Sequence, residues 1–262
     1  MGNYFSSSVS ERRHGWKKDT EDKRDLHHNF KITRTHNTIK MVDLRDHMPE
    51  VYDQGQLGSC TANAIGGAYE YDQIKQGELE PFVPSRLFIY YNERAIEGTV
   101  DEDSGAMIRD GMKTINNIGV VPEPMWPYDI QKFKDKPTED CFSEAQWHHS
   151  VEYKRVQQTK EQMKQCLIEG FPIIFGFVVY ESFESPEVAQ TGIMSMPKEG
   201  EKVLGGHAVV CCGFDESKQM FLIRNSWSSN WGIDGYFWMP YDFLTNPEYC
   251  SDLWTLKRVY DN

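Results

Sequence analysis

The chain has 262 residues, of which 39% are hydrophobic, 13% aromatic and 26% charged, and its formal net charge is −12. This balance is typical of a globular protein with a substantial core, and it excludes a chain that is disordered throughout. No apolar run approaches the roughly 18 residues that span a bilayer, and the first residues lack the apolar stretch of a secretory signal.

Residues 1–40 differ from the rest of the chain. They hold nine Lys or Arg residues against five acids, in a protein that is acidic overall. They show no sustained helical or strand period, which predicts a flexible segment. A basic segment beside an acidic body can fold back on it, so we expect residues 1–40 to be either flexible or regulatory. The acidic body opposes binding to nucleic acid.

The extreme N-terminus offers a second role for this segment. Gly2 and Ser6 match the M-G-x-x-x-S pattern of N-myristoylation, and basic residues follow. Association with a membrane is expected only if Gly2 is acylated. Otherwise we expect an intracellular protein.

From residue 41 onward, helices are predicted first and strands later. Apolar residues recur at helical spacing in 60–76, 85–94, 106–116 and 160–169, with Ser59 as the expected N-cap of the first helix and Gly77 as its end. A strand is expected at 151–156, and β-rich runs follow at 172–180, 207–214, 220–227 and 235–241. This order predicts an α+β protein with a helical half and a sheet half.

Six cysteines lie in the chain without CxxC pairs, and we interpret them as reduced thiols in a reducing compartment. Cys60 differs from the other five because it starts a predicted helix. Unpaired N–H groups and the helix dipole stabilise a thiolate there, which lowers a thiol pKa from about 8.5 to roughly 3.5–7.5. The preceding QGQLGS supplies two glycines for a tight turn and the amide of Gln54.

Two later motifs supply a base and an orienting amide. His207 follows a Gly-Gly pair and precedes an apolar strand, in GGHAVVCCGF. Asn225 ends another apolar strand in LIRNSW, two residues before Trp227. A nucleophile, a base and an orienting group are what thiol-based acyl transfer requires. Cys211 and Cys212 follow His207 closely, but adjacent strand residues point to opposite faces, so no metal site is expected.

With these three motifs in this order, the sequence resembles the papain-like cysteine peptidases, the family that includes the cathepsins, from about Val42 to Leu256. It looks most like microbial and viral members without a secretory signal. The resemblance implies a two-lobed fold, with a central helix starting at the catalytic cysteine, a β-barrel-like antiparallel lobe and a cleft between the lobes. It implies a peptidase domain over 41–262, with a helical lobe at about 51–145, a sheet lobe at about 146–240 and a C-terminal segment that packs back across.

The same resemblance implies roles for the residues of the motifs. Cys60 would attack the scissile carbonyl of a protein or peptide substrate, and His207 would pair with it and protonate the leaving amine. Asn225 would hold the imidazole, and Trp227 would shield that contact from water. Gln54 and the backbone N–H of Cys60 would form the oxyanion hole. No metal or cofactor is implied.

Four further positions are implied to bind substrate. Ser104 and Gly105, in EDSGAMIRDG, resemble the stretch whose backbone pairs with the non-primed side of the peptide, although an ordinary turn is the alternative. Gly206 stands in the cleft where many relatives carry a polar residue. Asp252 aligns with the base of the S2 pocket, which binds the P2 residue of the substrate, and an acid there would favour Arg or Lys at P2.

The sequence also departs from the family pattern. Leu57 replaces a cysteine that forms a disulfide in secreted members, and Thr61 replaces a tryptophan, which predicts an altered cleft wall. His148 and His149 are similar to the histidines of an occluding loop, but no insertion bounded by cysteines surrounds them. Two other functions stay open: an acyltransferase or transglutaminase-like enzyme on the same scaffold, and a non-catalytic peptide-binding module.

Overall fold

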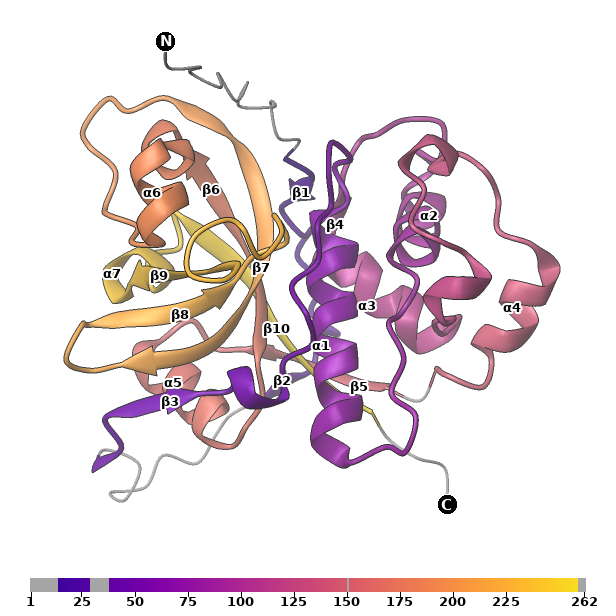
Figure 1. Ribbon diagram of the computed structural model, residues 1–262, viewed down its shortest axis with the longest axis horizontal. Coiled ribbons are helices and arrows are strands. Elements are labelled where there is room, and N and C mark those ends of the chain that lie inside the picture. The colour runs from indigo at the N-terminus through magenta and orange to yellow at the C-terminus, as the bar shows by residue number, and fades with distance from the viewer. Residues whose placement is uncertain (1–13, 29–37, 150, 259–262) are drawn as a thin grey trace, which may run out of the picture.

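The computed structural model describes residues 14–28, 38–149 and 151–258, and it has an α+β fold of two lobes (Figure 1). The helical lobe contains α1 (Cys60–Gln76), α2 (Arg86–Glu97), α3 (Ile108–Asn117) and α4 (Glu139–Ala145). The other lobe is built on one sheet and carries α5 (Lys160–Ile168), α6 (Pro186–Thr191) and α7 (Tyr241–Leu244). No helix in the described part of the chain is long and apolar enough to cross a membrane.

The large sheet runs in the order β2-β5-β10-β6-β7-β8-β9, and β3 also pairs with β7. Its strands are β2 (His27–His28), β3 (Met41–Asp43), β5 (Val151–Val156), β6 (Ile173–Tyr180), β7 (Val203–Asp215), β8 (Met220–Arg224), β9 (Tyr236–Pro240) and β10 (Cys250–Arg258). Every pair is antiparallel except β2 with β5. Among the described strands the path does not close into a barrel.

Helix α1 lies between the lobes and packs against both α2 and β7 (Figure 1). Residues 60–69 are all buried, because the helix is covered on both sides. The predicted bounds are confirmed, and Gly77 ends the helix in the left-handed conformation, with φ of 72°. Ser59 occupies the N-cap position, but its side chain makes no capping bond.

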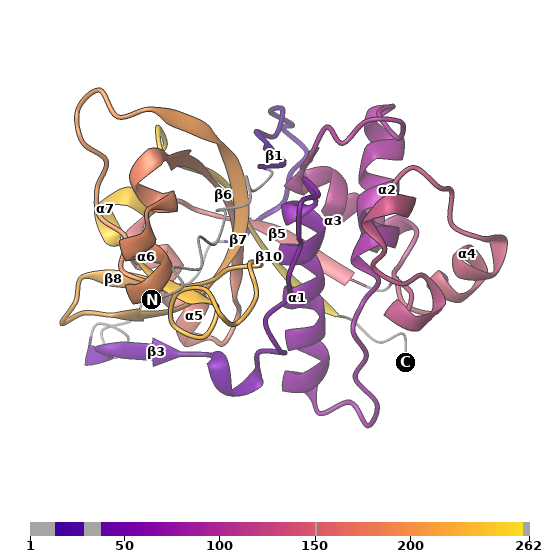
Figure 2. The same cartoon turned by 45° about the horizontal axis from the view of Figure 1, so that its top comes forward.

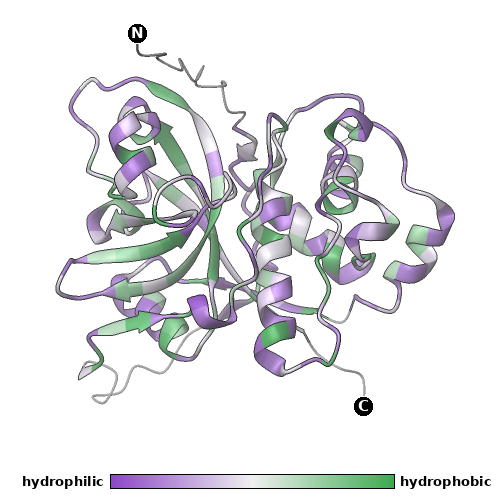
Figure 3. Cartoon of the chain, in the orientation of Figure 1, coloured by the Kyte–Doolittle hydropathy of each residue, from purple (hydrophilic) through white to green (hydrophobic). Residues whose placement is uncertain are grey.

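Each lobe has its own hydrophobic core. The sheet lobe buries a cluster rich in aromatic side chains, among them Phe175, Phe177, Phe221 and Trp227. The helical lobe buries mainly aliphatic residues of α1, α2 and α3. Figure 3 shows the apolar residues concentrated along the strands, while the helices carry both apolar and polar residues. Two cores that meet at α1 leave the catalytic motifs along the boundary between the lobes.

Residues 14–28, here called the N-terminal arm, join both lobes. In the arm, β1 (Trp16–Lys17) runs parallel to β4 (Ala106–Met107) of the helical lobe, and β2 runs parallel to β5. Figure 1 shows β1 beside β4, and Figure 2 also shows β1 at the boundary between the lobes. These residues therefore pair with strands of the body, whereas Gly2 and Ser6 lie outside the described residues. Because β4 takes residues 106–107, α3 begins two residues later than predicted.

Candidate active site

His207 and Asn225 meet at the ends of neighbouring strands. His207 lies in β7 and Asn225 directly follows β8, which pairs with β7. The Nε2 atom of His207 lies 2.8 Å from Oδ1 of Asn225, and the indole of Trp227 stacks on the imidazole at a centroid distance of 4.8 Å. All three side chains are buried. The sequence therefore identified three residues that the fold brings into contact.

The orientation of the Asn225 amide determines the tautomer of His207. Its Oδ1 also accepts a hydrogen bond from the backbone N–H of Ser226, at 2.8 Å. The atom that faces Nε2 of His207 is thus the amide oxygen, which can only accept hydrogen bonds. Nε2 of His207 must therefore carry a proton and donate it to this oxygen. In the neutral ring, Nδ1 is then the nitrogen that can accept a proton.

Cys60 is the first residue of α1. The backbone N–H groups of Ala208, which follows His207, and of Gly15 of the arm lie near its sulfur. The thiol is fully buried, and burial raises its pKa to about 12, although these N–H groups act in the opposite direction. The low pKa predicted from the helix N-terminus therefore does not hold while the arm covers the thiol. The arm excludes the water that would solvate a thiolate.

Gln54 is anchored to the sheet lobe. Its Oε1 accepts a hydrogen bond from Oγ of Ser226 at 2.8 Å, and its Nε2 donates to the carbonyl of Leu57 at 2.9 Å. Its side chain is completely buried. These contacts hold the amide within the turn that leads to Cys60, which is where the resemblance places the oxyanion hole.

Two residues that the sequence did not assign to the site support this turn. The hydroxyl of Tyr128 donates to the carbonyl of Gln54 at 2.9 Å and lies 2.5 Å from Oγ of Ser59. The carboxylate of Asp103 accepts from the backbone N–H of Gly58 at 2.9 Å. The aromatic-Pro-Tyr run at 126–128 is the one signal that pointed to Tyr128, and it predicts only a structural corner.

Thr61 turns its hydroxyl toward α2, and the altered cleft wall at this position stays a prediction. It is fully buried, and its hydroxyl donates to Oε2 of Glu93 at 2.8 Å. Burial raises the pKa of Glu93 well above its ordinary value. Thr61 and Glu93 therefore form a contact between α1 and α2 behind the nucleophile. His148 packs its ring on Phe82, in the helical lobe.

The backbone of the arm fills the space over Cys60. The carbonyl of Gly15 accepts from the backbone N–H of Ala106 at 2.8 Å. A Cβ atom on Gly15 would lie 1.8 Å from the carbonyl oxygen of Gly58, so no larger residue fits at this position. The arm thus touches the nucleophile, the turn before it and β4.

Trp16 extends from the arm toward the sheet lobe. Its ring lies so close to Gly176 and Gly206 that an added Cβ would be 1.9 Å and 2.7 Å away, respectively. Its indole N–H donates to Oδ2 of Asp252 at 3.2 Å. Trp16 therefore occupies the place where the resemblance puts the P2 pocket, between Gly206 and Asp252.

The backbone of the arm pairs with Ala106 and Met107, immediately after Gly105. Gly105 has a left-handed φ of 69°, and a Cβ there would lie 2.0 Å from the carbonyl oxygen of Gly15. The hydroxyl of Ser104 donates to Oγ1 of Thr99 at 2.9 Å. The predicted peptide-pairing stretch thus contacts the arm through Gly105 and the two residues after it.

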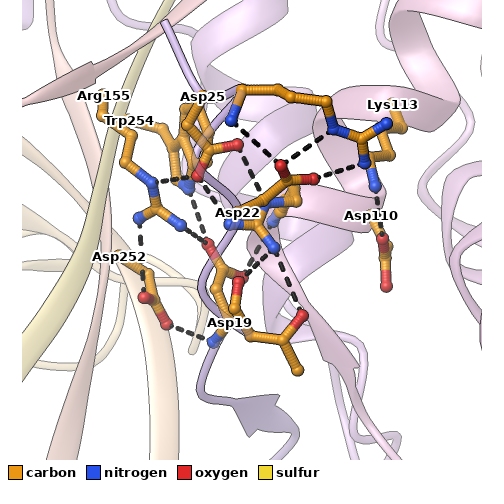
Figure 4. A network of polar contacts seen from close by, with 11 residues as sticks. Asp19, Asp22, Asp25, Asp110, Lys113, Arg155, Asp252 and Trp254 are labelled. Carbon is orange, nitrogen blue, oxygen red and sulfur yellow. Dashed lines mark hydrogen bonds and ion pairs between the residues drawn. The ribbon is translucent and has the colours of Figure 1, made fainter. Parts of the chain in front are cut away.

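Acidic residues of the arm are bound by arginines of the body (Figure 4). The guanidinium of Arg155 lies 2.6 Å from Asp25 and 3.0 Å from Asp19, and it also lies 3.7 Å from Asp252. Arg109 makes a second ion pair with Asp25, at 2.5 Å. These ion pairs have the opposite polarity to the one expected from a basic segment on an acidic body, whereas Lys17 pairs with Glu97 at 2.8 Å in the expected polarity.

Comparisons with known proteins agree with this site. Residues 38–250 match the family model for papain family cysteine proteases. An uncharacterised peptidase C1-like protein of Acanthamoeba polyphaga mimivirus is 50% identical over 230 residues, which cover 85% of this chain and 74% of that protein. Cathepsin L of Sarcophaga peregrina is 28% identical over 79% of this chain and 61% of its own length.

The crystal structure of xylellain, a cysteine protease from Xylella fastidiosa, superposes with a TM-score of 0.87 at 40% identity, covering 97% of this chain and all of that one. A digestive procathepsin L 3 of Tenebrio molitor shares the fold, with a TM-score of 0.68 at 16% identity over 95% of this chain and 76% of its own. The chain therefore belongs to the papain family of cysteine proteases and is a cysteine peptidase that acts on proteins or peptides.

Proposed function

We propose that this peptidase cleaves internal peptide bonds, with Cys60 as nucleophile, His207 as base and acid, Asn225 as orienting amide and Gln54 in the oxyanion hole. The observation that carries the proposal is the 2.8 Å contact between His207 and Asn225 under the Trp227 ring. Cys60 lies close to this pair, because the backbone N–H of Ala208, the residue after His207, acts on its sulfur.

The chemistry follows from the tautomer. Nδ1 of His207 takes the thiol proton of Cys60, and the resulting imidazolium is stabilised by the oxygen of Asn225. The thiolate attacks the carbonyl carbon, and the oxyanion that forms is stabilised by the Gln54 amide and the N–H of Cys60. The imidazolium then protonates the leaving amine, and a water molecule activated by His207 hydrolyses the thioester.

Transfer of the acyl group to an amine instead of water is the alternative reaction of the same thioester. A peptide-binding module without catalysis is a second alternative. The complete set of Cys60, His207, Asn225 and Gln54 favours hydrolysis over both.

Internally quenched peptides test this function. The wild-type protein should release two peptide products, while Cys60→Ala and His207→Ala should release neither. Mass spectrometry of the products distinguishes hydrolysis from transfer, because an added amine acceptor appears in the product only after transfer. Cleavage by the Cys60→Ala variant at the wild-type rate would refute the assignment.

We also infer that the N-terminal arm keeps the enzyme latent. Gly15 covers the thiol of Cys60, and Trp16 fills the space beside Gly206. A substrate needs the same space. Residues 1–38 can be deleted to test this: a chain that begins at Ile39 should be more active than the full chain, and equal activities would show that the segment does not inhibit.

Asp252 is proposed to form the base of the P2 pocket. Arg155 already lies 3.7 Å from its carboxylate, so part of its charge is balanced without a substrate. We therefore expect a preference for Arg or Lys over Leu at P2 to be small, and an aromatic side chain with an N–H donor to be accepted, as Trp16 is. A peptide series that varies P2, measured with wild type and Asp252→Ala, separates these contributions.

A further inference from the structure

We propose that Glu184 selects a basic side chain at P1′, the substrate position immediately after the scissile bond. This inference rests on the proposed function, and it names a feature of the substrate. Its basis is the contact that the arm makes between His14 and this carboxylate, near His207.

The arm marks the subsites on both sides of the nucleophile. The backbone N–H of Gly15 acts on the sulfur of Cys60, so Gly15 lies over the nucleophile. Trp16, the next residue, lies against Gly206 and pairs with β4, on the side assigned to the non-primed residues. His14 precedes Gly15 in the chain and packs on Gly205, with its ring centroid 6.5 Å from that of His207. Because Trp16 follows Gly15 on the non-primed side, we assign the position of His14 to the primed side.

Glu184 receives the side chain of His14. The Nε2 atom of His14 lies 2.7 Å from Oε1 of Glu184, and the side chain of Glu184 is 23% exposed in this contact. Within residues 14–28, 38–149 and 151–258, His14 is the hydrogen-bonding partner of this carboxylate, and no Lys or Arg pairs with it.

The fold fixes Glu184 close to the reacting groups. It ends a 3-10 turn, η5 (Glu181–Glu184), which directly follows β6. Its neighbour Phe183 is buried and packs on Trp227, with ring centroids 5.5 Å apart. Because Trp227 stacks on His207, the position of Glu184 is tied to that of the catalytic imidazole.

The two acids of the cleft differ in what remains when the arm leaves. Asp252 keeps Arg155, which also loses its contacts with Asp19 and Asp25 and becomes more available to it. Glu184 loses its one described partner. A partly buried carboxylate without a counter-ion favours a cationic ligand, because a charge-assisted hydrogen bond replaces the water that it has lost. Charge selectivity is thus expected at P1′ and not at P2.

Binding of uncleaved peptides tests this inference separately from catalysis. The experiment uses the full chain with two substitutions: Trp16→Ala loosens the arm, and Cys60→Ala prevents turnover. The binding of fluorescent peptides that differ only at P1′ is then measured. We expect Lys or Arg at P1′ to bind about fivefold more tightly than Gln, the gain typical of a partly exposed ion pair. Added Glu184→Gln should reduce this ratio to near one.

Glu181→Gln is the matched control, since Glu181 belongs to the same turn and is exposed. That variant should keep the preference for a basic P1′ residue. Equal binding of the peptides, no binding of either, or a preference that survives Glu184→Gln would overturn the proposal. Turnover of the same peptides by the chain that retains Cys60 tests the peptidase function, so the two failures are distinguishable.

Discussion

The indole N–H of Trp16 donates to the carboxylate of Asp252 across 3.2 Å, so the arm and the last strand of the sheet lobe meet inside the cleft. Trp16→Ala removes this contact and the packing of the ring on Gly176 and Gly206. Loss of about 1.4 kcal/mol of arm binding raises the open fraction about tenfold. We expect at least that increase in kcat/KM of the full chain.

Leu26→Ala is the control for this variant, because Leu26 belongs to the same arm but its side chain is 66% exposed. It should leave kcat/KM unchanged. The same activity for Trp16→Ala and wild type would mean that Trp16 does not hold the arm in the cleft.

Asp19 makes the closed arm sensitive to pH. Burial, together with the negative charge of Asp252, raises the pKa of Asp19 from 3.8 to about 6 in the closed state. Closure therefore takes up a proton. The stability that protonated Asp19 gives to the closed arm is fully present below about pH 4 and is lost as the pH rises through about 6. The full chain should gain activity relative to the chain from Ile39 over this range.

Other charged groups of the arm affect closure in a different pH range or with the opposite sign. Burial of Asp25 is outweighed by its bonds to Arg109 and Arg155, so its pKa is lowered and its contribution to closure changes only at pH values below about 4. Burial also lowers the pKa of His28, which weakens closure as the pH falls below 6.5. Asp19→Asn removes only the contribution of Asp19 to the pH dependence of closure, because the variant retains His28. The activity profiles of wild type and Asp19→Asn should therefore differ between pH 4 and 6. Identical profiles would exclude Asp19 as the sensor.

Asn225→Ala should leave the fold intact but release the imidazole of His207. The ring then loses the acceptor that fixes its tautomer, and misplacement of a catalytic group costs up to about 10² in rate. We expect kcat to fall by about that factor, with little change in KM. Steady-state kinetics on the chain from Ile39 measures this, and an unchanged kcat would remove Asn225 from the mechanism.

Tyr128→Phe tests the support of the oxyanion hole. The change removes the hydrogen bond to the carbonyl of Gln54 and the contact with Ser59, while it keeps the ring and its packing. Since one donor of an oxyanion hole is worth about 10² to 10³ in rate, a displaced turn should lower kcat by about tenfold. Tyr153→Phe, a change of the same size in β5, should have no effect on kcat. Equal kinetics for the two variants would assign Tyr128 a purely structural role.

Much of the site could be predicted because its signals are local. The bounds of α1 follow from Gly77 and from apolar spacing, and Cys60, His207 and Asn225 stand in short motifs at the ends of regular elements. The α+β fold follows from the order of the elements and is confirmed by the related structures.

The arm could not be placed from the sequence, because its contacts are not local. Its strands have two residues each, which is too short for any period to appear. Its anchors join Asp25 with Arg109 and Trp16 with Asp252, residues far apart in the chain. Net charge predicts the pair of Lys17 with Glu97, but not the ion pairs that the acids of this basic segment make with Arg109 and Arg155. The raised pKa of Cys60 follows from burial of the thiol, which also requires non-local packing.

The rate at which an epoxide inhibitor of cysteine proteases alkylates Cys60 tests the central claim most directly. Intact-mass analysis over time should show a single adduct, mapped to Cys60, that forms at least about tenfold faster in the chain from Ile39 than in the full chain. Cys60→Ala should form none. Equal rates in both chains, or an adduct on another cysteine, would contradict a Cys60 nucleophile covered by the arm.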